Sequence, residues 1–324
     1  MTESDLYQSL DRELDALINQ VIEQVAPAEV GAIPTLYQYT DGRALRSILE
    51  HERIWATHSA FLNDYGEGKY IWDRMLRVAD GNNDLEPMTA KVTKDLLSHL
   101  ATHPAVLGKE VFVACFSEDP DSLSQWRAYA NDGDGYSVGF RLAKVPEATE
   151  ICPELSTDLM GPLLAPVLYD EGRQSEALSV IPRMIEASKQ AVEQGLEQTQ
   201  AELVCVASVL RLASLLACYF KHPGFQEERE WRLVWIPTAE FAQKCAKRLR
   251  DTQLLGFRDT KYGMAPYLDW PLRGADGEAP TSIAEIWMGP RAAPTTEHSL
   301  EMFLLSLGRP PGSVKICSSE TTYR

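Results

Sequence analysis

Apolar residues recur at helical spacing in three stretches of the chain. Leucines and valines lie three or four positions apart between residues 4 and 25, and acidic and amide side chains fill the positions between them. This pattern predicts an amphipathic N-terminal helix that ends at Pro27. The same spacing predicts two helices over residues 176–220 and one over residues 297–307. The N-terminal helix could pack on its own domain, mediate a homo-oligomer or bind a regulatory partner.

Short runs of β-branched and aromatic residues predict the strands. They cover residues 36–40, 53–57, 111–117, 136–141, 228–236, 283–288 and 314–317. Strands and helices mix without the regular spacing of a doubly wound sheet, so the sequence predicts the α+β class. We expect an N-terminal helix over residues 1–27 and a single domain over residues 28–324, with helical insertions at about 64–105 and 174–220.

The net charge and the spacing of the cysteines and histidines limit which functional classes we expect. A formal net charge of −16 argues against broad, non-specific binding to nucleic acid, which needs a positive surface. The basic cluster of Lys244, Lys247, Arg248 and Arg250 is better explained as cations near a helix C-terminus. The six cysteines include no Cys-x-x-Cys pair and the six histidines show no ligand spacing, so no metal site is expected.

The N-terminus and the apolar runs indicate where the protein resides. Residues 1–5 are acidic where a signal peptide would be basic, and no apolar segment follows them. No run of apolar residues reaches the length that a membrane span needs. We therefore expect a cytoplasmic protein without a membrane anchor.

The most informative local pattern is the acidic segment before the run Trp231-Arg232-Leu233-Val234-Trp235. In a strand, alternate side chains share a face, so Glu228, Glu230 and Arg232 would lie together. Two carboxylates that close repel each other, and each needs solvent or a donor such as Arg232 or a ligand hydroxyl. This pair suits a reaction that passes through a cationic sugar. On the motif alone, an edge strand with a polar face is the better explanation.

A second pattern combines aromatic residues with an arginine. Ser122 and Gln125 have the spacing of a capping box, which would open a short helix that carries Trp126, Arg127 and Tyr129. Arg127 offers a forked donor for a phosphate or a carboxylate. The alternative, equally open, is that the aromatic residues belong to the core and Arg127 pairs with an internal carboxylate. Two further aromatic residues, Tyr37 and Trp55, are expected in the core.

Taken in order, several short blocks resemble the bacterial family known as domain of unknown function 2971. The blocks run from residue 36 to the C-terminus: Leu36-Tyr37-Gln38-Tyr39-Thr40, Phe61-Leu62-Asn63-Asp64, Cys115-Phe116-Ser117, Ser124-Gln125-Trp126-Arg127-Ala128-Tyr129, residues 135–140, Phe225 with Glu228, Glu230 and Arg232, Ile286-Trp287-Met288-Gly289-Pro290-Arg291, and Tyr323-Arg324. Each block is weak by itself, whereas the ordered set is specific.

That family in turn resembles a distant branch of the ADP-ribosyltransferase superfamily. The resemblance implies a split, mixed or antiparallel sheet with flanking helices. It also implies a late-strand motif at Glu228-Arg229-Glu230, a middle-strand position at Ser117 and a first-strand position at Gln38. The superfamily usually has His or Arg at the first position, so Gln38 is a departure that brings no charge. The implied NAD-contacting residues are Gln38, Tyr39, Thr40, Ser117, Trp126, Arg127, Tyr129 and Arg232.

The resemblance implies an enzyme that splits NAD at the nicotinamide–ribose bond and passes ADP-ribose to an unidentified acceptor. Glu230 would stabilise the ribosyl cation, and Glu228 would position the acceptor. NAD is the expected substrate, and no metal is expected. With water as acceptor the protein would be an NAD glycohydrolase, as in toxins and phage-defence effectors. A different class, a non-catalytic module that binds a nucleotide or senses a phage component, is favoured by Gln38. A nuclease is the least supported class, because the chain lacks clustered metal ligands.

Overall fold

The computed structural model describes residues 2–25, 33–62, 70–71, 73–77, 111–142, 145, 148–151, 159–237, 250, 253–260, 263–272 and 281–323. The chain divides into two compact units. The first comprises residues 1–26, 62–109 and 166–225, and the second comprises residues 27–61, 110–165 and 226–324. The N-terminal helix and the two expected insertions thus fall mostly in the first unit. Most of the insertion expected at about 64–105 and the basic cluster around residues 244–250 lie outside the described residues, apart from short stretches.

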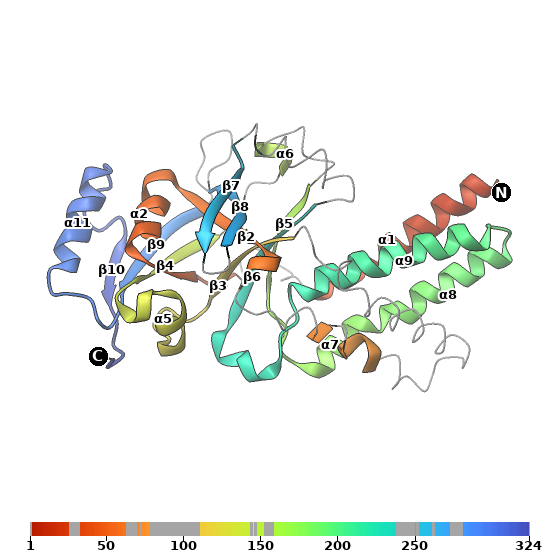
Figure 1. The fold of residues 1–324 in the computed structure, drawn as a ribbon, viewed down its shortest axis with the longest axis horizontal. Coiled ribbons are helices and arrows are strands. Elements are labelled where there is room, and N and C mark those ends of the chain that lie inside the picture. The colour runs from red at the N-terminus through yellow and green to blue at the C-terminus, as the bar shows by residue number, and fades with distance from the viewer. Residues whose placement is uncertain are drawn as a thin grey trace. The chain divides into compact units, whose positions relative to one another are not determined.

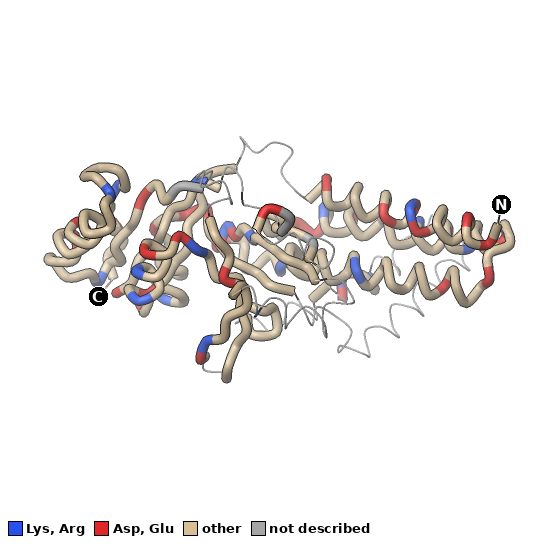
Figure 2. The backbone as a smooth tube through the Cα atoms, turned by 90° about the horizontal axis from the view of Figure 1, so that it is seen from above, with Lys and Arg blue, Asp and Glu red and all other residues tan. Residues whose placement is uncertain are grey.

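The first unit is built on long helices. They are α1 (Glu3–Val25), α7 (Glu171–Leu178), α8 (Val180–Glu193) and α9 (Gln198–Ala217). Helices α1, α8 and α9 pack against one another (Figure 1). The predicted amphipathic helix is present in α1, which buries Leu6, Leu10, Leu14, Leu17, Ile18, Val21 and Val25. Acidic residues recur along the remaining surface of α1 (Figure 2).

Helix α9 is more apolar than the sequence analysis allowed for. By length and composition alone it could cross a membrane, although no membrane span was expected. Half of its most apolar stretch is buried inside the protein. Residues such as Val209, Leu212 and Leu216 are fully or almost fully buried, and α9 packs against both α1 and α8. These contacts are those of the central helix of a bundle.

The second unit contains a ten-stranded sheet. Its strands are β1 (Leu36–Thr40), β2 (Arg53–His58), β3 (Phe112–Ser117), β4 (Tyr136–Leu142), β5 (Leu159–Pro166), β6 (Glu230–Pro237), β7 (Leu255–Thr260), β8 (Gly263–Pro271), β9 (Thr281–Met288) and β10 (Lys315–Ser318). The order along the main path is β10-β9-β4-β1-β3-β2-β8-β7, and β6 joins β3 and β5. The β9–β10 pair is parallel, whereas β1, β3, β4, β6 and the β2–β8–β7 strands pair antiparallel. The predicted α+β class is therefore confirmed.

Strand β3 is the centre of this sheet, because three strands pair with it. Strand β6 pairs with its whole length, from Phe112 to Ser117. Strand β1 pairs with β3 at Ser117, whereas β2 pairs with it at Phe112 and Val113. Helix α2 (Gly42–His51) connects β1 to β2. One edge of β3 is thus divided between two strands, and the sheet splits at that point.

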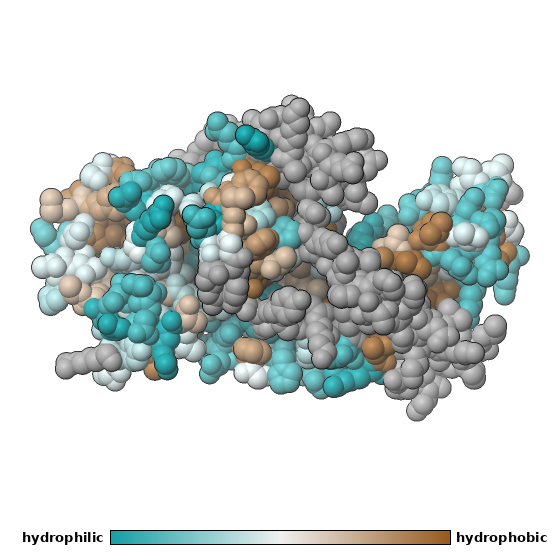
Figure 3. All heavy atoms as spheres, in the orientation of Figure 1, coloured by the Kyte–Doolittle hydropathy of each residue, from teal (hydrophilic) through white to brown (hydrophobic). Residues whose placement is uncertain are grey.

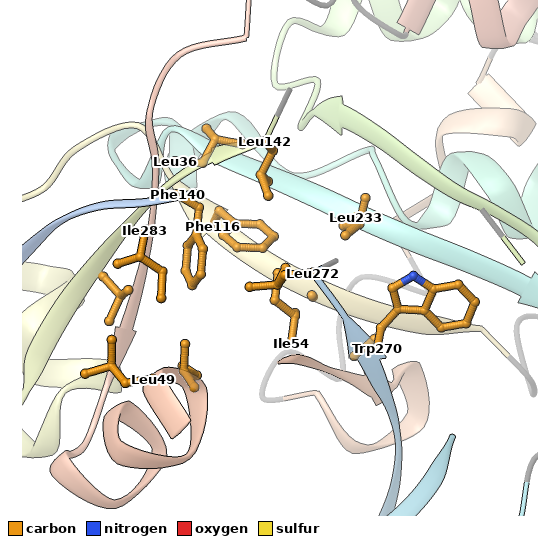
Figure 4. Close-up of a cluster of buried hydrophobic side chains, with 14 of the residues drawn as sticks. Leu36, Leu49, Ile54, Phe116, Phe140, Leu142, Leu233, Trp270, Leu272 and Ile283 are labelled. Atoms are coloured by element: carbon orange, nitrogen blue, oxygen red, sulfur yellow. The ribbon is translucent and has the colours of Figure 1, made fainter. Parts of the chain in front are cut away.

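The two faces of the sheet differ in character. One face carries the main core, in which Leu36, Ile54, Phe116, Phe140, Leu233 and Trp270 pack together (Figure 4). Leu45, Ile48 and Leu49 of α2, and Leu300 and Leu304 of α11 (Thr296–Ser306), complete that core. The opposite face carries a smaller cluster of Tyr37 and Tyr39 with Trp126 and Ala130. Helix α5 (Leu123–Tyr129) provides Trp126, so it covers part of this second face.

Candidate functional site

Three side chains from three neighbouring strands lie in one row on the face opposite the main core. Tyr37 of β1 stands directly opposite Ser117 of β3, and Ser117 stands directly opposite Glu230 of β6. Directly paired residues of an antiparallel sheet project their side chains to the same face. The row therefore brings an aromatic ring, a hydroxyl and a carboxylate to one level of the sheet. All three residues are buried.

The carboxylate of Glu230 is fixed by Arg232, two residues further along the same strand face. Arg232 donates from Nε to Oε1 at 2.7 Å and from a terminal nitrogen to Oε2 at 3.0 Å. The side chains of Arg232 and Glu230 are only 3% and 9% exposed. A bidentate contact of this kind sets both the position and the plane of the carboxylate. The prediction that Arg232 is a donor to the acidic motif is in accord with this geometry.

Glu228 is placed differently from Glu230. The strand begins at Glu230, not at Glu228, because residues 223–228 form the short 3₁₀ helix η6 (Pro223–Glu228). Arg229, between the two glutamates, has a φ of 43°, in the left-handed region that few residues other than glycine adopt. Strand alternation therefore does not extend back to Glu228. The expected shared face holds for Glu230 and Arg232 but not for Glu228.

The backbone around this kink is attached to the end of β3. The Ser117 hydroxyl donates to the carbonyl of Glu228 at 2.7 Å and accepts from the N–H of Asp119 at 3.1 Å. The N–H of Glu118 donates to the carbonyl of Arg229. Ser117 therefore holds the segment that carries both glutamates, besides lying next to Glu230 in the row.

Tyr37 extends the row toward the other edge of the sheet. Its hydroxyl donates a hydrogen bond to Glu285 of β9, across Gly139 of β4. A Cβ atom at Gly139 would lie 2.9 Å from both the Tyr37 ring and the Glu285 side chain, so only glycine leaves room for this contact. Burial, followed by the contact with Glu285, raises the pKa of the Tyr37 hydroxyl. Lys315 of β10 completes the row, with Nζ 3.6 Å from Glu285.

Tyr39 and Trp126 fix the loop between β3 and α5. The Tyr39 hydroxyl donates to the carbonyl of Asp119 and accepts from the N–H of Ser122, both at 2.8 Å. The Trp126 indole donates to Asp121 at 2.7 Å and meets the Tyr39 ring edge to face. Ser122 is the N-cap residue, but its side chain makes no capping bond, so the predicted capping box does not form. Tyr39 and Trp126, 8% and 0% exposed, are core residues of this loop.

Arg127 and Tyr129 lie on the exposed side of α5. Tyr129 is 42% exposed. The guanidinium of Arg127 lies 5.7 Å from the centre of the Tyr323 ring. Of the three aromatic residues among the implied NAD contacts, one of which would face the nicotinamide, only Tyr129 is exposed. Arg127 is not in the Tyr37–Ser117–Glu230 row, although its exposed position leaves it open to an anion.

Gln38 and Thr40 lie on the other face of β1 from the row. Gln38 pairs with Val138 and Thr40 pairs with Tyr136, and Val138 belongs to the main core. The residue of β1 that joins Ser117 and Glu230 is therefore Tyr37. Sequence reasoning assigned Tyr37 to the core and did not consider Glu285. The sequence did contain a signal for this contact. Gly139 lies inside the predicted strand 136–141, and a glycine inside a strand often marks a position that another part of the chain approaches closely.

Within the described residues, no group of three or more His, Cys, Asp or Glu side chains is arranged to hold a metal ion. The site is instead a row in which the hydroxyls of Tyr37 and Ser117 lie between two paired carboxylates, Glu285 beside Lys315 and Glu230 bound by Arg232. The fold and this row define an α+β protein with a mixed, mostly antiparallel sheet and a buried acid–arginine pair at the start of one strand.

The model of the family described as protein of unknown function (DUF2971) matches residues 125–233. This segment runs from α5 through β4, β5 and helices α7, α8 and α9 into β6, and it includes Glu228, Glu230 and Arg232. The match supports the resemblance to that family over this part of the chain. No curated protein and no solved structure matches the chain.

Proposed function

We propose that the protein is an ADP-ribosyltransferase-like enzyme that cleaves the nicotinamide–ribose bond of NAD and transfers ADP-ribose to an acceptor. The observation that carries the proposal is the row Tyr37–Ser117–Glu230 across β1, β3 and β6. The resemblance assigns the middle-strand contact with NAD to Ser117 and the catalytic role to Glu230, and these two residues are 113 positions apart in sequence and directly paired in space. Their pairing supports the proposal.

In this reaction the bond between the nicotinamide nitrogen and ribose C1′ breaks, and its electron pair leaves with nicotinamide, which becomes neutral. The ribosyl cation then forms a bond with the nucleophile of the acceptor, which releases a proton. A fixed carboxylate stabilises such a cation best when it needs no reorganisation. Glu230 meets that condition because Arg232 holds both of its oxygens. Each carboxylate oxygen can accept a further hydrogen bond, so Glu230 can still bind a ribose hydroxyl.

The other proposed roles follow from position. Glu228 lies outside the strand, beyond the kink at Arg229, where it would meet the acceptor and not the ribose. Tyr129 is the exposed aromatic residue that could face nicotinamide, and Arg127 could bind the pyrophosphate. With water as acceptor, the same row would act as an NAD glycohydrolase.

A non-catalytic nucleotide-binding module is the second candidate. It is favoured by one observation, namely that both oxygens of Glu230 already accept hydrogen bonds from a buried arginine. An ion pair of this kind can have a purely structural role, in which it holds the start of β6 in place.

Nicotinamide release from NAD separates the two candidates. We expect the wild-type protein to release nicotinamide and Glu230→Gln to lose at least 100-fold of that activity, on the order of the loss when one transition-state stabiliser is removed. Glu227→Gln, at the exposed acidic residue three positions earlier, is the matched control and should retain full activity. Stimulation by cell lysate would indicate transfer to a macromolecule. No release by well-folded wild-type protein, with or without lysate, would favour the binding module.

A further inference from the structure

A second group of aromatic and basic side chains lies on the same sheet face as the row, over β2, β7 and β8. Trp55 of β2 and Tyr267 of β8 stack with their ring centres 4.5 Å apart and their planes tilted by 31°. The guanidinium of Arg258 of β7 lies 6.0 Å from the centre of the Trp55 ring. Trp55 and Tyr267 are both partly exposed, and Arg258 is exposed.

The strand register establishes which face this group occupies. Thr57 of β2 pairs with Tyr267 on one side and with Val113 of β3 on the other. Val113 and Ser117 share a face of β3, because they are four residues apart in one strand. The aromatic group is therefore on the face of Ser117 and Glu230, and four residues of strand, roughly 13 Å, separate the two levels.

Two features position the rings and the guanidinium. A Cβ atom at Gly256 would lie 2.3 Å from the Tyr267 ring, so the glycine allows that ring to lie across β7. Arg258 donates from a terminal nitrogen to the Thr57 hydroxyl at 2.7 Å, which directs the guanidinium toward Trp55. The arrangement is a preformed one, held by the backbone of one strand and the hydroxyl of another.

Arg258 also differs from other arginines in its charge environment. Arg53, Arg291 and Arg309 each pair with a carboxylate. No carboxylate of the described chain lies within ion-pair distance of Arg258. Desolvation lowers the pKa of its guanidinium. An arginine that is partly desolvated and has no carboxylate partner among the described residues is suited to bind an anion.

We propose that Trp55, Tyr267 and Arg258 form a nucleotide-binding site, in which the aromatic pair stacks on the base and Arg258 binds the phosphate. Aromatic side chains stack on any base, since every base has a π-face, and a neighbouring arginine adds a cation. A nucleotide combines a planar ring with an anion in one molecule, as the site requires. This site goes beyond the proposed function and does not depend on whether the Glu230 row cleaves NAD.

Calorimetric titration of the full chain with AMP and with adenosine tests the proposal. We expect the wild type to bind AMP more tightly than adenosine. Trp55→Leu should weaken both ligands by about tenfold, the size of one base–aromatic stack. Arg258→Gln should remove the preference for AMP and leave the affinity for adenosine unchanged.

Two control variants test whether the loss of AMP affinity is specific to this face of the sheet. Phe257→Leu changes an exposed residue of β7 on the opposite face. It is a conservative change of one hydrophobic surface residue, and Figure 3 shows several such residues among the hydrophilic ones on the side of the molecule that it draws. Glu227→Gln changes an exposed acidic residue that has no proposed role. Both should bind AMP as the wild type does. The proposal is wrong if the wild type fails to bind AMP, or if Phe257→Leu or Glu227→Gln weakens AMP as much as Trp55→Leu does. Because Arg258 is exposed, Arg258→Gln still decides the matter if Trp55→Leu does not fold, and an unchanged preference for AMP in that variant also overturns it.

Discussion

At the scale of single residues, the Glu230–Arg232 pair has a structural consequence as well as a proposed chemical one. Both charges are almost fully removed from solvent. A buried ion pair contributes little net stability by itself, because desolvation offsets most of the attraction. Removing one partner is far more damaging, since the other charge is then buried without compensation. Stability measurements can therefore separate the structural role of the pair from a role in catalysis.

Glu230→Met and Arg232→Met are each expected to lower the free energy of unfolding by about 3–5 kcal/mol, because each leaves the other charge buried and uncompensated. The double variant with both changes should recover most of that loss, since it removes both buried charges at similar volume. Urea unfolding of the two single variants, the double variant and the wild type measures this as a double-mutant cycle. A double variant no more stable than Glu230→Met would show that the pair is not an isolated unit.

The raised pKa values of Tyr37 and Tyr39 predict that the stability of the fold depends on pH above the neutral range. Burial raises the pKa of both hydroxyls above the ordinary value of 10.0. Above about pH 10 the unfolded chain loses these protons while the folded chain keeps them, so stability falls as pH rises, by up to about 1.4 kcal/mol per pH unit for each tyrosine.

Urea midpoints measured from pH 8 to 11 test this pH dependence. Tyr37→Phe should flatten the alkaline loss, although it also removes the bond to Glu285 and lowers stability at neutral pH. The control is Tyr7→Phe, on the exposed surface of α1. An unchanged alkaline slope in Tyr37→Phe would contradict the assignment.

At the same scale, the residue types of the candidate site could be predicted from the sequence, but the face of the sheet to which each side chain points could not. The pairing of Glu230 with Arg232 follows from their spacing in one strand. The choice between Gln38 and Tyr37 does not, because adjacent residues of β1 point to opposite faces and only the register with β3 decides which one meets Ser117. That register is a long-range property that local patterns do not contain.

At the scale of elements, strands rich in branched and aromatic residues were predictable and strands rich in glycine and proline were not. The patterns identified β3, β4 and β9 almost to their ends. They missed β5, β7 and β8, which contain Gly161, Pro162, Gly256, Pro266 and Pro271. Glycine and proline ordinarily argue against a strand. In β7 the glycine is instead needed, because the Tyr267 ring takes the space of its side chain.

Strand β4 offers a test of such a position. Gly139→Ala would place a Cβ atom 2.9 Å from both Tyr37 and Glu285, at the point where the register with β9 shifts. We expect a loss of about 1–3 kcal/mol in the free energy of unfolding, as for other overpacked sites. Thermal and urea unfolding measure the loss. Gly42→Ala is the control, since its Cβ would meet only Tyr136 at 3.5 Å in the first turn of α2, and it should be neutral or slightly stabilising. Equal effects of the two changes would show that Gly139 is not a special position.

At the scale of the whole molecule, the chain interleaves two units. The first unit takes three separate stretches of sequence and the second takes three others. Hydrophobic periodicity identified α1, α8 and α9 of the first unit and did not separate the short helix α7 from α8. It could not show that α1 packs against α8 and α9, more than 150 residues later, because a helical pattern fixes which face is buried and not what buries it.

The burial of side chains in the α1–α8–α9 bundle predicts which substitutions destabilise the first unit. Leu14 of α1 is completely buried, so Leu14→Ala should cost about 2–5 kcal/mol. Tyr7→Ala, at a residue of the same helix that is 43% exposed, should change stability by no more than about 0.5 kcal/mol. Differential scanning calorimetry of both variants measures the effects. Similar costs for both would mean that α1 does not depend on its buried face.

The left-handed residue at Arg229 has a consequence for any pair of acidic residues separated by one position. In an uninterrupted strand such a pair forms a single unit, and its members share surroundings and repel each other. Here the chain turns between the two, so that one glutamate belongs to the rigid sheet and the other to the segment that approaches it. A substitution of the second side chain therefore leaves the ion pair of the first intact, since Ser117 attaches β3 to the backbone of Glu228 and not to its side chain. The two carboxylates of the motif can thus change separately in the course of evolution.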